Sequence, residues 1–117
     1  MEQLIETILS ISEGIRYVAI YKDGKLFSSA KGDLQNASSS ESDKYEELIV
    51  NPTLLKLVTQ RGNIDCGGAE FVLIRYGYFF EFVKPISGGH VSVGMQLKEN
   101  PLKLIPLIED AIGRQDL

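Results

Sequence analysis

The sequence predicts an α+β domain in which helices cover both faces of a five-stranded antiparallel sheet. A first pair of β-rich runs flanks Asp23 and Gly24, a dipeptide that supplies the positive φ angles of a tight hairpin turn. A second pair occupies residues 71–85, and residues 90–97 alternate between apolar and polar side chains, as a half-buried strand does. Helical patterns open the chain, separate the two hairpins and close the chain.

The first helix and hairpin follow from spacing. Apolar side chains recur at helical intervals between residues 2 and 12, and Gly14 offers a stop. In the hairpin that follows, a strict two-residue loop would place Lys22 opposite Lys25, an unfavourable like-charge pair. A loop one or two residues longer would avoid this pairing.

The middle of the chain predicts a solvated loop and then helical structure. Residues 31–42 cluster Ser, Asn, Asp and Gly with almost no apolar side chain. Asp43, with a glutamate three residues later, has the form of a capping box that opens a helix. Asn51 and Pro52 look like an N-cap and a first-turn proline, which would restart a helix that ends at Gly62. One kinked helix and two short helices both fit this pattern.

The second hairpin carries apolar side chains on both faces. A two-residue loop at Tyr76 and Gly77 pairs Val72 with Glu81. One face holds Phe71, Leu73, Phe80 and Phe82. Burying each of these is worth roughly 1.5–3 kcal/mol, so this face meets the main core. The other face holds Val72, Ile74, Phe79 and Val83, interrupted by Glu70 and Glu81. It suits a lighter layer or a partner.

The last strand and helix complete the two layers. The core face of the strand holds Val91, Val93, Met95 and Leu97, and the other face holds His90, Ser92, Gly94 and Gln96. Asn100 and Pro101 start a final helix that ends at Gly113, and Pro106 should bend it. We expect the first and last helices on the core face and the middle helix on the lighter face.

Composition excludes several classes of function. The 117 residues suffice for one domain, residues 1–117. The net charge is −4 with no Lys/Arg cluster, which argues against nucleic acid as a partner. No apolar run approaches the roughly 20 residues of a membrane span. Cys66 is the single cysteine, which favours a reducing, cytoplasmic location and offers no metal-ligand spacing. We expect no metal and no cofactor.

Four side chains could be catalytic, but we favour a structural interpretation for each. Cys66, beside Asp65 and with His90 as a base, could form a thiol site, but nothing supplies a third orienting group. We interpret Cys66 as a small buried filler in a glycine-rich turn, and His90 as a surface histidine in a loop. Glu70 and Glu81 could form an acid/base pair, but bridges to Lys or Arg at the sheet edge are commoner. The sequence thus predicts no catalytic residue.

The two candidate edge strands differ. The run "KLFSS" is short, polar and charged at its start, which is how sheets protect an exposed edge. The run "EFVLI", Glu70 to Ile74, is unbroken by Pro or Gly. At a sheet edge it would invite another strand.

The order of elements, the hairpin "VAIYKDGKLFSSA" and the segment "RYGYFFEFVKPISGGHVSVGMQLKENPLKLIPLIEDAI" resemble the Roadblock/LC7 domain family. The resemblance implies the strand order 2-1-5-4-3, with the third strand at an edge. It also implies homodimers that pair this edge and the neighbouring middle helix. The interface would consist of Glu70, Phe71, Val72, Leu73, Ile74, Leu54, Leu55 and Val58. The chain departs from the family at "NASSSES" and at "NPTLLKLVTQRGNIDCGG", where a proline shortens the middle helix.

Members of that family are non-enzymatic adaptors or regulators of small Ras-like GTPases, or subunits of motor complexes. The resemblance therefore implies a cytoplasmic homodimer that binds a small GTPase or another protein. Two other classes of function stay open. One is a small-molecule sensor with a cavity between the sheet and the middle helix, and the other is a thiol enzyme that uses Cys66.

Overall fold

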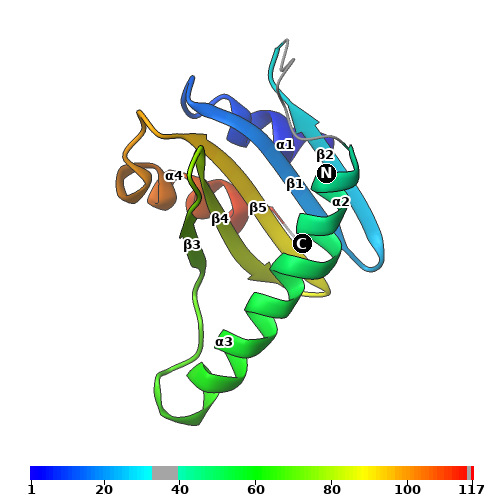
Figure 1. The fold of residues 1–117 in the computed structure, drawn as a ribbon, viewed down its shortest axis with the longest axis vertical. Helices are drawn as coiled ribbons and strands as arrows, with labels where there is room; N and C mark the ends of the chain where they lie inside the picture. The colour runs from blue at the N-terminus through cyan, green and yellow to red at the C-terminus, as the bar shows by residue number, and fades with distance from the viewer. Residues whose placement is uncertain (33–39, 116) are drawn as a thin grey trace.

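The computed structural model describes residues 1–32, 40–115 and 117, and it has helices on both faces of one sheet (Figure 1). The elements are α1 (Glu2–Leu9), β1 (Ile15–Lys22), β2 (Lys25–Ala30), α2 (Ser40–Tyr45), the π-helical turn η1 (Glu46–Val50), α3 (Asn51–Asp65), β3 (Val72–Arg75), β4 (Phe79–Ile86), β5 (Gly89–Gln96) and α4 (Pro101–Gly113). The strands are antiparallel in the order β2-β1-β5-β4-β3. This confirms the predicted fold class and places β2 and β3 at the two edges. None of the helices in the described ranges is long and apolar enough to cross a membrane.

The main core lies between the sheet and the pair α1 and α4, behind the sheet in Figure 1. Its fully buried side chains include Ile8, Ile15, Val18, Ile20, Phe82, Val91, Val93, Met95 and Ile108. Phe71, Leu73 and Phe80 pack against this cluster, as predicted for that face of the second hairpin. Leu97, predicted on the core face, follows the end of β5 and is 38% exposed.

The first hairpin has the strict two-residue turn. Asp23 and Gly24 adopt φ angles of 52° and 83°, and Lys22 lies opposite Lys25. The alternative of a longer loop is therefore not observed. The like-charge pair is tolerated because Lys22 Nζ donates a hydrogen bond to the carbonyl oxygen of Ser87 at 2.7 Å, which directs it away from the exposed Lys25.

The register of the second hairpin differs from the prediction by two residues. Val72 pairs with Val83, and Leu73 pairs with Phe82. Tyr76 leaves the turn tip because its ring packs on Phe79, with centroids 5.2 Å apart, and Arg75 donates hydrogen bonds to the carbonyls that follow it. A shift of two keeps every side chain on its predicted face, since strand side chains alternate with a period of two.

The middle helical segment is continuous from α2 through η1 to α3 and runs across the opposite face of the sheet (Figure 1). Of the two alternatives, the single irregular helix is observed. Asp43 lies inside α2, so it does not open the helix, and α3 passes Gly62 and ends at Asp65. Asn51 is not an N-cap, because its backbone is already helical. Most of the predicted loop, residues 33–39, lies outside the described residues.

The first and last helices also differ in detail from the prediction. α1 ends at Leu9, earlier than the apolar pattern suggested. In α4, the side chain of Asn100 accepts a hydrogen bond from the amide of Leu102, which confirms the predicted N-cap, and the helix continues past Pro106 to Gly113.

Candidate interaction surface

The free edge of β3 is the first part of the predicted interface. Among the described strands β3 pairs only with β4, so its other side is an edge of the sheet. Val72, Leu73 and Ile74 are half-buried. Glu70 and Phe71 precede the strand, and the Phe71 ring packs on Phe82 with centroids 5.3 Å apart. The edge strand is thus shorter than the predicted run from Glu70 to Ile74.

The second part is an apolar side of α3 that is largely exposed. Leu54 is half-buried and Val58 is 37% exposed, whereas Leu55 is buried against the sheet. Leu57 and Ile64 are 58% and 76% exposed. We call Leu54, Leu57, Val58 and Ile64 the α3 outer face. Their spacing of three, four and seven residues places them on one side of a helix.

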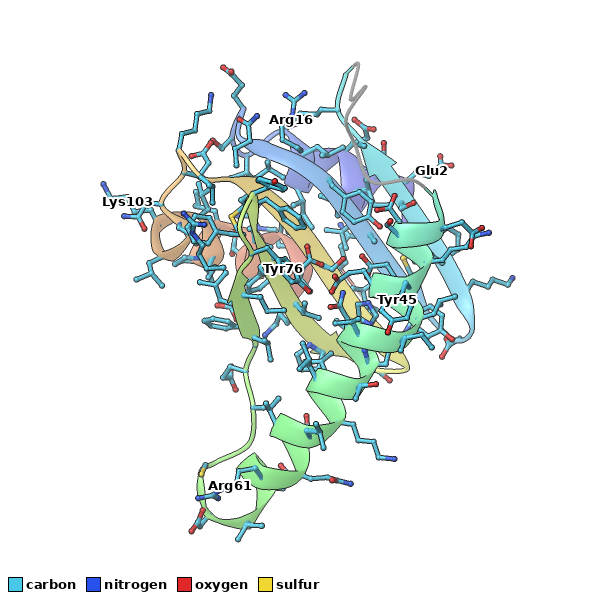
Figure 2. The ribbon with its side chains drawn as sticks, viewed as in Figure 1. Glu2, Arg16, Tyr45, Arg61, Tyr76 and Lys103 are labelled. Carbon is cyan, nitrogen blue, oxygen red and sulfur yellow. The ribbon has the colours of Figure 1, made fainter. Side chains whose placement is uncertain are left out.

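The far half of α3 extends beyond the sheet. Arg61 marks this end of the helix in Figure 2, and the chain then returns through residues 66–71 to reach β3 (Figure 1). The amide of Gly68 donates to the carbonyl of Gly62 at 3.0 Å, which ties the returning chain to the helix. The β3 edge and the α3 outer face therefore belong to neighbouring parts of the molecule.

A buried polar cluster fastens the middle helical segment to the sheet. We define the polar cluster as Tyr17 of β1, Glu47 of η1, Asn51 of α3, Glu81 of β4, and His90 and Ser92 of β5. Glu47, Asn51 and Ser92 are 0% exposed, and His90 and Glu81 are 1% and 2% exposed. The sheet residues of the cluster lie on the face that was predicted to meet a lighter layer.

Glu47 is the centre of this cluster. Its Oε1 atom lies 2.8 Å from His90 Nε2 and accepts from Asn51 Nδ2 at 3.0 Å. Its Oε2 atom accepts from Ser92 Oγ at 2.6 Å and from the Tyr17 hydroxyl at 3.2 Å. Four hydrogen-bond donors around one carboxylate satisfy its buried charge, which would otherwise be very unfavourable. The π-helical turn carries Glu47 into this position, and such turns often occur at functional sites.

Glu81 has a different environment within the same cluster. It accepts from Asn51 Nδ2 at 3.3 Å, and Asn51 Oδ1 has no partner in the described parts of the chain. Burial raises the pKa of Glu81 well above its ordinary value, and the nearby Glu47 and Glu46 raise that pKa further, while hydrogen bonds from Asn51 and Ser92 oppose the shift. The environment of Glu81 therefore favours a neutral carboxyl group.

Acidic groups continue from the cluster toward α2. The Tyr76 hydroxyl donates to Glu46 Oε1 at 2.9 Å, and burial together with Glu46 raises the pKa of Tyr76 to about 12. Burial also raises the pKa values of Glu46 and Asp43. The pKa of Tyr17 is raised by burial and by Glu47. The Tyr17 and Tyr76 hydroxyls therefore remain hydrogen-bond donors at neutral pH.

These positions correct two sequence interpretations. His90 is not a surface histidine, because β5 places it beneath η1 against Glu47. Glu81 is not bridged to Lys or Arg and is not paired with Glu70, because the strand directs it into the polar cluster. Glu70 is exposed and lies before β3.

Cys66 is also placed differently from its interpretation. It is exposed at the end of α3 and is not a buried filler, because α3 and the returning chain carry it beyond the sheet. Its sulfur lies 3.2 Å from Arg61 Nη1 and 3.3 Å from Asp65 Oδ1. His90 is held by Glu47 in the polar cluster and is not part of this group.

Sequence reasoning missed Glu47 and Asn51 as the centre of the cluster. A signal was present in the fifth strand, whose alternation puts His90 and Ser92 on the same face. Two polar side chains on the face that a helix covers need polar partners from that helix. Glu47 and Asn51, four residues apart, are on one side of the helical segment and meet this need.

Two features of the described residues bear on metal or ligand binding. Within residues 1–32, 40–115 and 117, no group of His, Cys, Asp and Glu side chains could hold a metal ion. An open groove of about 540 Å³ lies between α1 and β2, on the core side of the sheet. The place proposed for a sensor cavity, between the sheet and the middle helix, holds the contacting side chains of the polar cluster.

Comparison with known proteins supports the fold. No protein-family model matches the chain, and no curated protein sequence matches it significantly. Among solved structures, the crystal structure of MglC from Myxococcus xanthus is similar, with a TM-score of 0.62 over 97% of this chain and 93% of that chain at 12% identity. At this identity the likeness shows the fold alone. The strand order and helices match the Roadblock-like fold of MglC, which confirms the architecture that the sequence resemblance implied.

Proposed function

We propose that this protein is a cytoplasmic, non-catalytic regulatory adaptor that forms a homodimer through the β3 edge and the α3 outer face. The observation that carries this proposal is the exposed apolar surface of α3. Its one buried apolar side chain is Leu55, while Leu57, Val58 and Ile64 are exposed. A second copy that pairs along β3 would cover this apolar surface and satisfy the free strand edge.

Oligomeric state tests the homodimer. We expect light scattering coupled to gel filtration to give a dimer at micromolar concentration. The double variant Leu57→Asp with Ile64→Asp should be a monomer, because it places two charges inside the proposed interface. The matched control is Leu102→Asp with Leu107→Asp on α4, where the leucines are 70% and 54% exposed. A monomeric wild type, or equal effects of the two double variants, would contradict the proposal.

The partner of this dimer, in our proposal, is a small Ras-like GTPase. Support comes from the resemblance to Roadblock/LC7 domains and from the fold shared with MglC. The test uses purified Ras-like GTPases from the same genome, loaded with GDP or a non-hydrolysable GTP analogue, in biolayer interferometry. We expect one nucleotide state of one GTPase to bind the wild-type dimer. Absence of binding by all of them would remove the GTPase assignment and leave the dimer to its own test.

A further inference from the structure

The other edge of the sheet, β2, is also free of any further strand among the residues that the structure describes. Within them β2 pairs only with β1, and its residue pairs run from Lys22–Lys25 to Tyr17–Ala30. The amide of Lys31 donates to the carbonyl of Arg16 at 2.8 Å, which shows that this position directs its backbone amide toward β1. Because inward and outward backbone groups alternate along an antiparallel edge strand, Leu26, Ser28 and Ala30 direct their amide and carbonyl groups away from the sheet.

A groove runs beside this free edge. It has a volume of about 540 Å³ and is lined by Glu2, Ile5 and Glu6 of α1 and by residues 26–29 of β2. Ile5 is buried and Leu26 and Phe27 are half-buried, so the groove has an apolar base. An extended chain added along β2 would project alternate side chains over this groove.

The rim of the groove is acidic. Glu2 and Glu6 are exposed on α1, and neither forms an ion pair with any residue the structure describes. Figure 2 shows Glu2 on the β2 side of the molecule. The residues that line the groove include no Lys or Arg. An incoming segment therefore meets negative charge without a competing cation in the groove.

The spacing of the two carboxylates matches an extended chain. Residues four apart on a helix are separated by about 6 Å along its axis. Side chains two apart on a strand, which share a face, are separated by about 7 Å. Two basic side chains at alternate positions of one strand are therefore about as far apart as Glu2 and Glu6 are along α1.

We propose that the β2 edge binds an extended peptide segment with Lys or Arg at alternate positions, which adds a strand to the sheet and places its basic side chains at Glu2 and Glu6. Backbone hydrogen bonds to Leu26, Ser28 and Ala30 supply the docking, as in other strand-addition complexes. The two carboxylates select the sequence. This site lies at the opposite edge from β3, so it does not depend on the proposed homodimer.

The test measures fluorescence anisotropy of a labelled short peptide of alternating valine and lysine, with the full-length protein as titrant. A peptide of the same composition with its valines and lysines in separate blocks is the control for charge alone. We expect the alternating peptide to bind more tightly and its affinity to fall as salt rises. Equal binding of the two peptides would overturn the proposal.

Two variants separate the carboxylates from the backbone edge. Glu2→Gln with Glu6→Gln should weaken binding by roughly three- to tenfold, the range expected for two exposed ion pairs. Ser28→Pro removes an outward amide without breaking the ladder to β1, and it should abolish binding, whereas Ser28→Ala should not. Thermal melting confirms that each variant is folded. Unchanged binding by the Glu2/Glu6 variant would overturn the proposal.

Self-association at β2 is the competing occupant. If Ser28→Pro reduces the oligomeric state and the alternating peptide does not bind, a second copy occupies this edge and the peptide proposal is wrong. If the peptide binds while the oligomeric state is unaffected by Ser28→Pro, the peptide site is supported. Neither result changes the test of the β3 dimer, which uses variants of α3.

Discussion

The same substitution at two buried glutamates should have opposite effects on stability. Glu47 and Glu81 are 0% and 2% exposed and share the polar cluster. Glu47 is bonded by His90, Ser92, Tyr17 and Asn51, whereas the pKa of Glu81 is raised by its burial and by neighbouring carboxylates. We expect Glu47→Gln to destabilise the protein and Glu81→Gln to stabilise it at neutral pH.

The loss of stability expected for Glu47→Gln follows from the four hydrogen bonds of Glu47. Bonds to a charged group contribute about 1.5–3 kcal/mol each, and bonds between neutral groups contribute about 1 kcal/mol. Replacing one carboxylate by an amide weakens all four and leaves part of the donor set without an acceptor. Relief of the buried charge offsets some of this loss. We expect Glu47→Gln to lower the free energy of unfolding by about 2–4 kcal/mol.

The gain in stability expected for Glu81→Gln depends on pH. With its pKa raised above the ordinary 4.5 in the folded protein, Glu81 holds a proton that the unfolded chain releases, so stability falls as pH rises. Each pH unit between 4.5 and the folded pKa of Glu81 costs about 1.4 kcal/mol. Glu81→Gln lacks this cost. Its advantage over the wild type should be near zero at about pH 4.5 and should grow until the folded pKa is reached.

Urea unfolding at a series of pH values between about 5 and 8 tests both substitutions. All samples need the same protomer concentration, because a dimer gains stability by mass action. The reasoning is refuted if Glu81→Gln is less stable than the wild type at neutral pH. It is also refuted if the stability difference between them does not change with pH, or if Glu47→Gln is as stable as the wild type.

Three further outcomes follow from the structure. Gly62→Ala should lower the free energy of unfolding by about 1–3 kcal/mol because its Cβ would lie 2.7 Å from the backbone of Gly68; Gly113→Ala, with no atom within 4 Å, should be neutral or stabilising in the same urea titration. Iodoacetamide should label Cys66 in the folded protein, as mass spectrometry can measure, because this thiol is exposed; a thiol labelled only in urea would contradict this. Hydrogen exchange of α3 should slow as protein concentration rises, since the proposed dimer covers its outer face, whereas exchange of α1 should not change; equal behaviour would count against the interface.

Much of the fold could be predicted because its main signals are local. The Asp23–Gly24 dipeptide fixes a hairpin turn through positive φ angles. Alternation from His90 to Gln96 identifies a strand and both of its faces. These signals depend on a residue and its near neighbours, so tertiary contacts did not override them. The sheet order, in contrast, came from the family resemblance and not from the residues themselves.

The errors occurred where distant contacts decide the structure. Asn51 before Pro52 has the sequence of an N-cap, but its amide group bonds Glu47 and Glu81 and the helix continues through it. The register of the second hairpin was missed because a shift of two residues leaves the hydrophobic pattern unchanged. The contact of Tyr76 with Glu46, thirty residues earlier in the chain, has no local signature.

The polar cluster also explains why the helical segment can present apolar side chains outward. An amphipathic helix normally buries its apolar side against its own core. Here Glu47, Asn51 and Leu55 are buried against the sheet, and hydrogen bonds such as that from Ser92 to Glu47 fasten the segment to it. The apolar side chains of the α3 outer face are then not needed for docking to the sheet. A helix that is fastened by polar contacts and is apolar on its free side remains folded in one copy and gains further stability only when that side is covered.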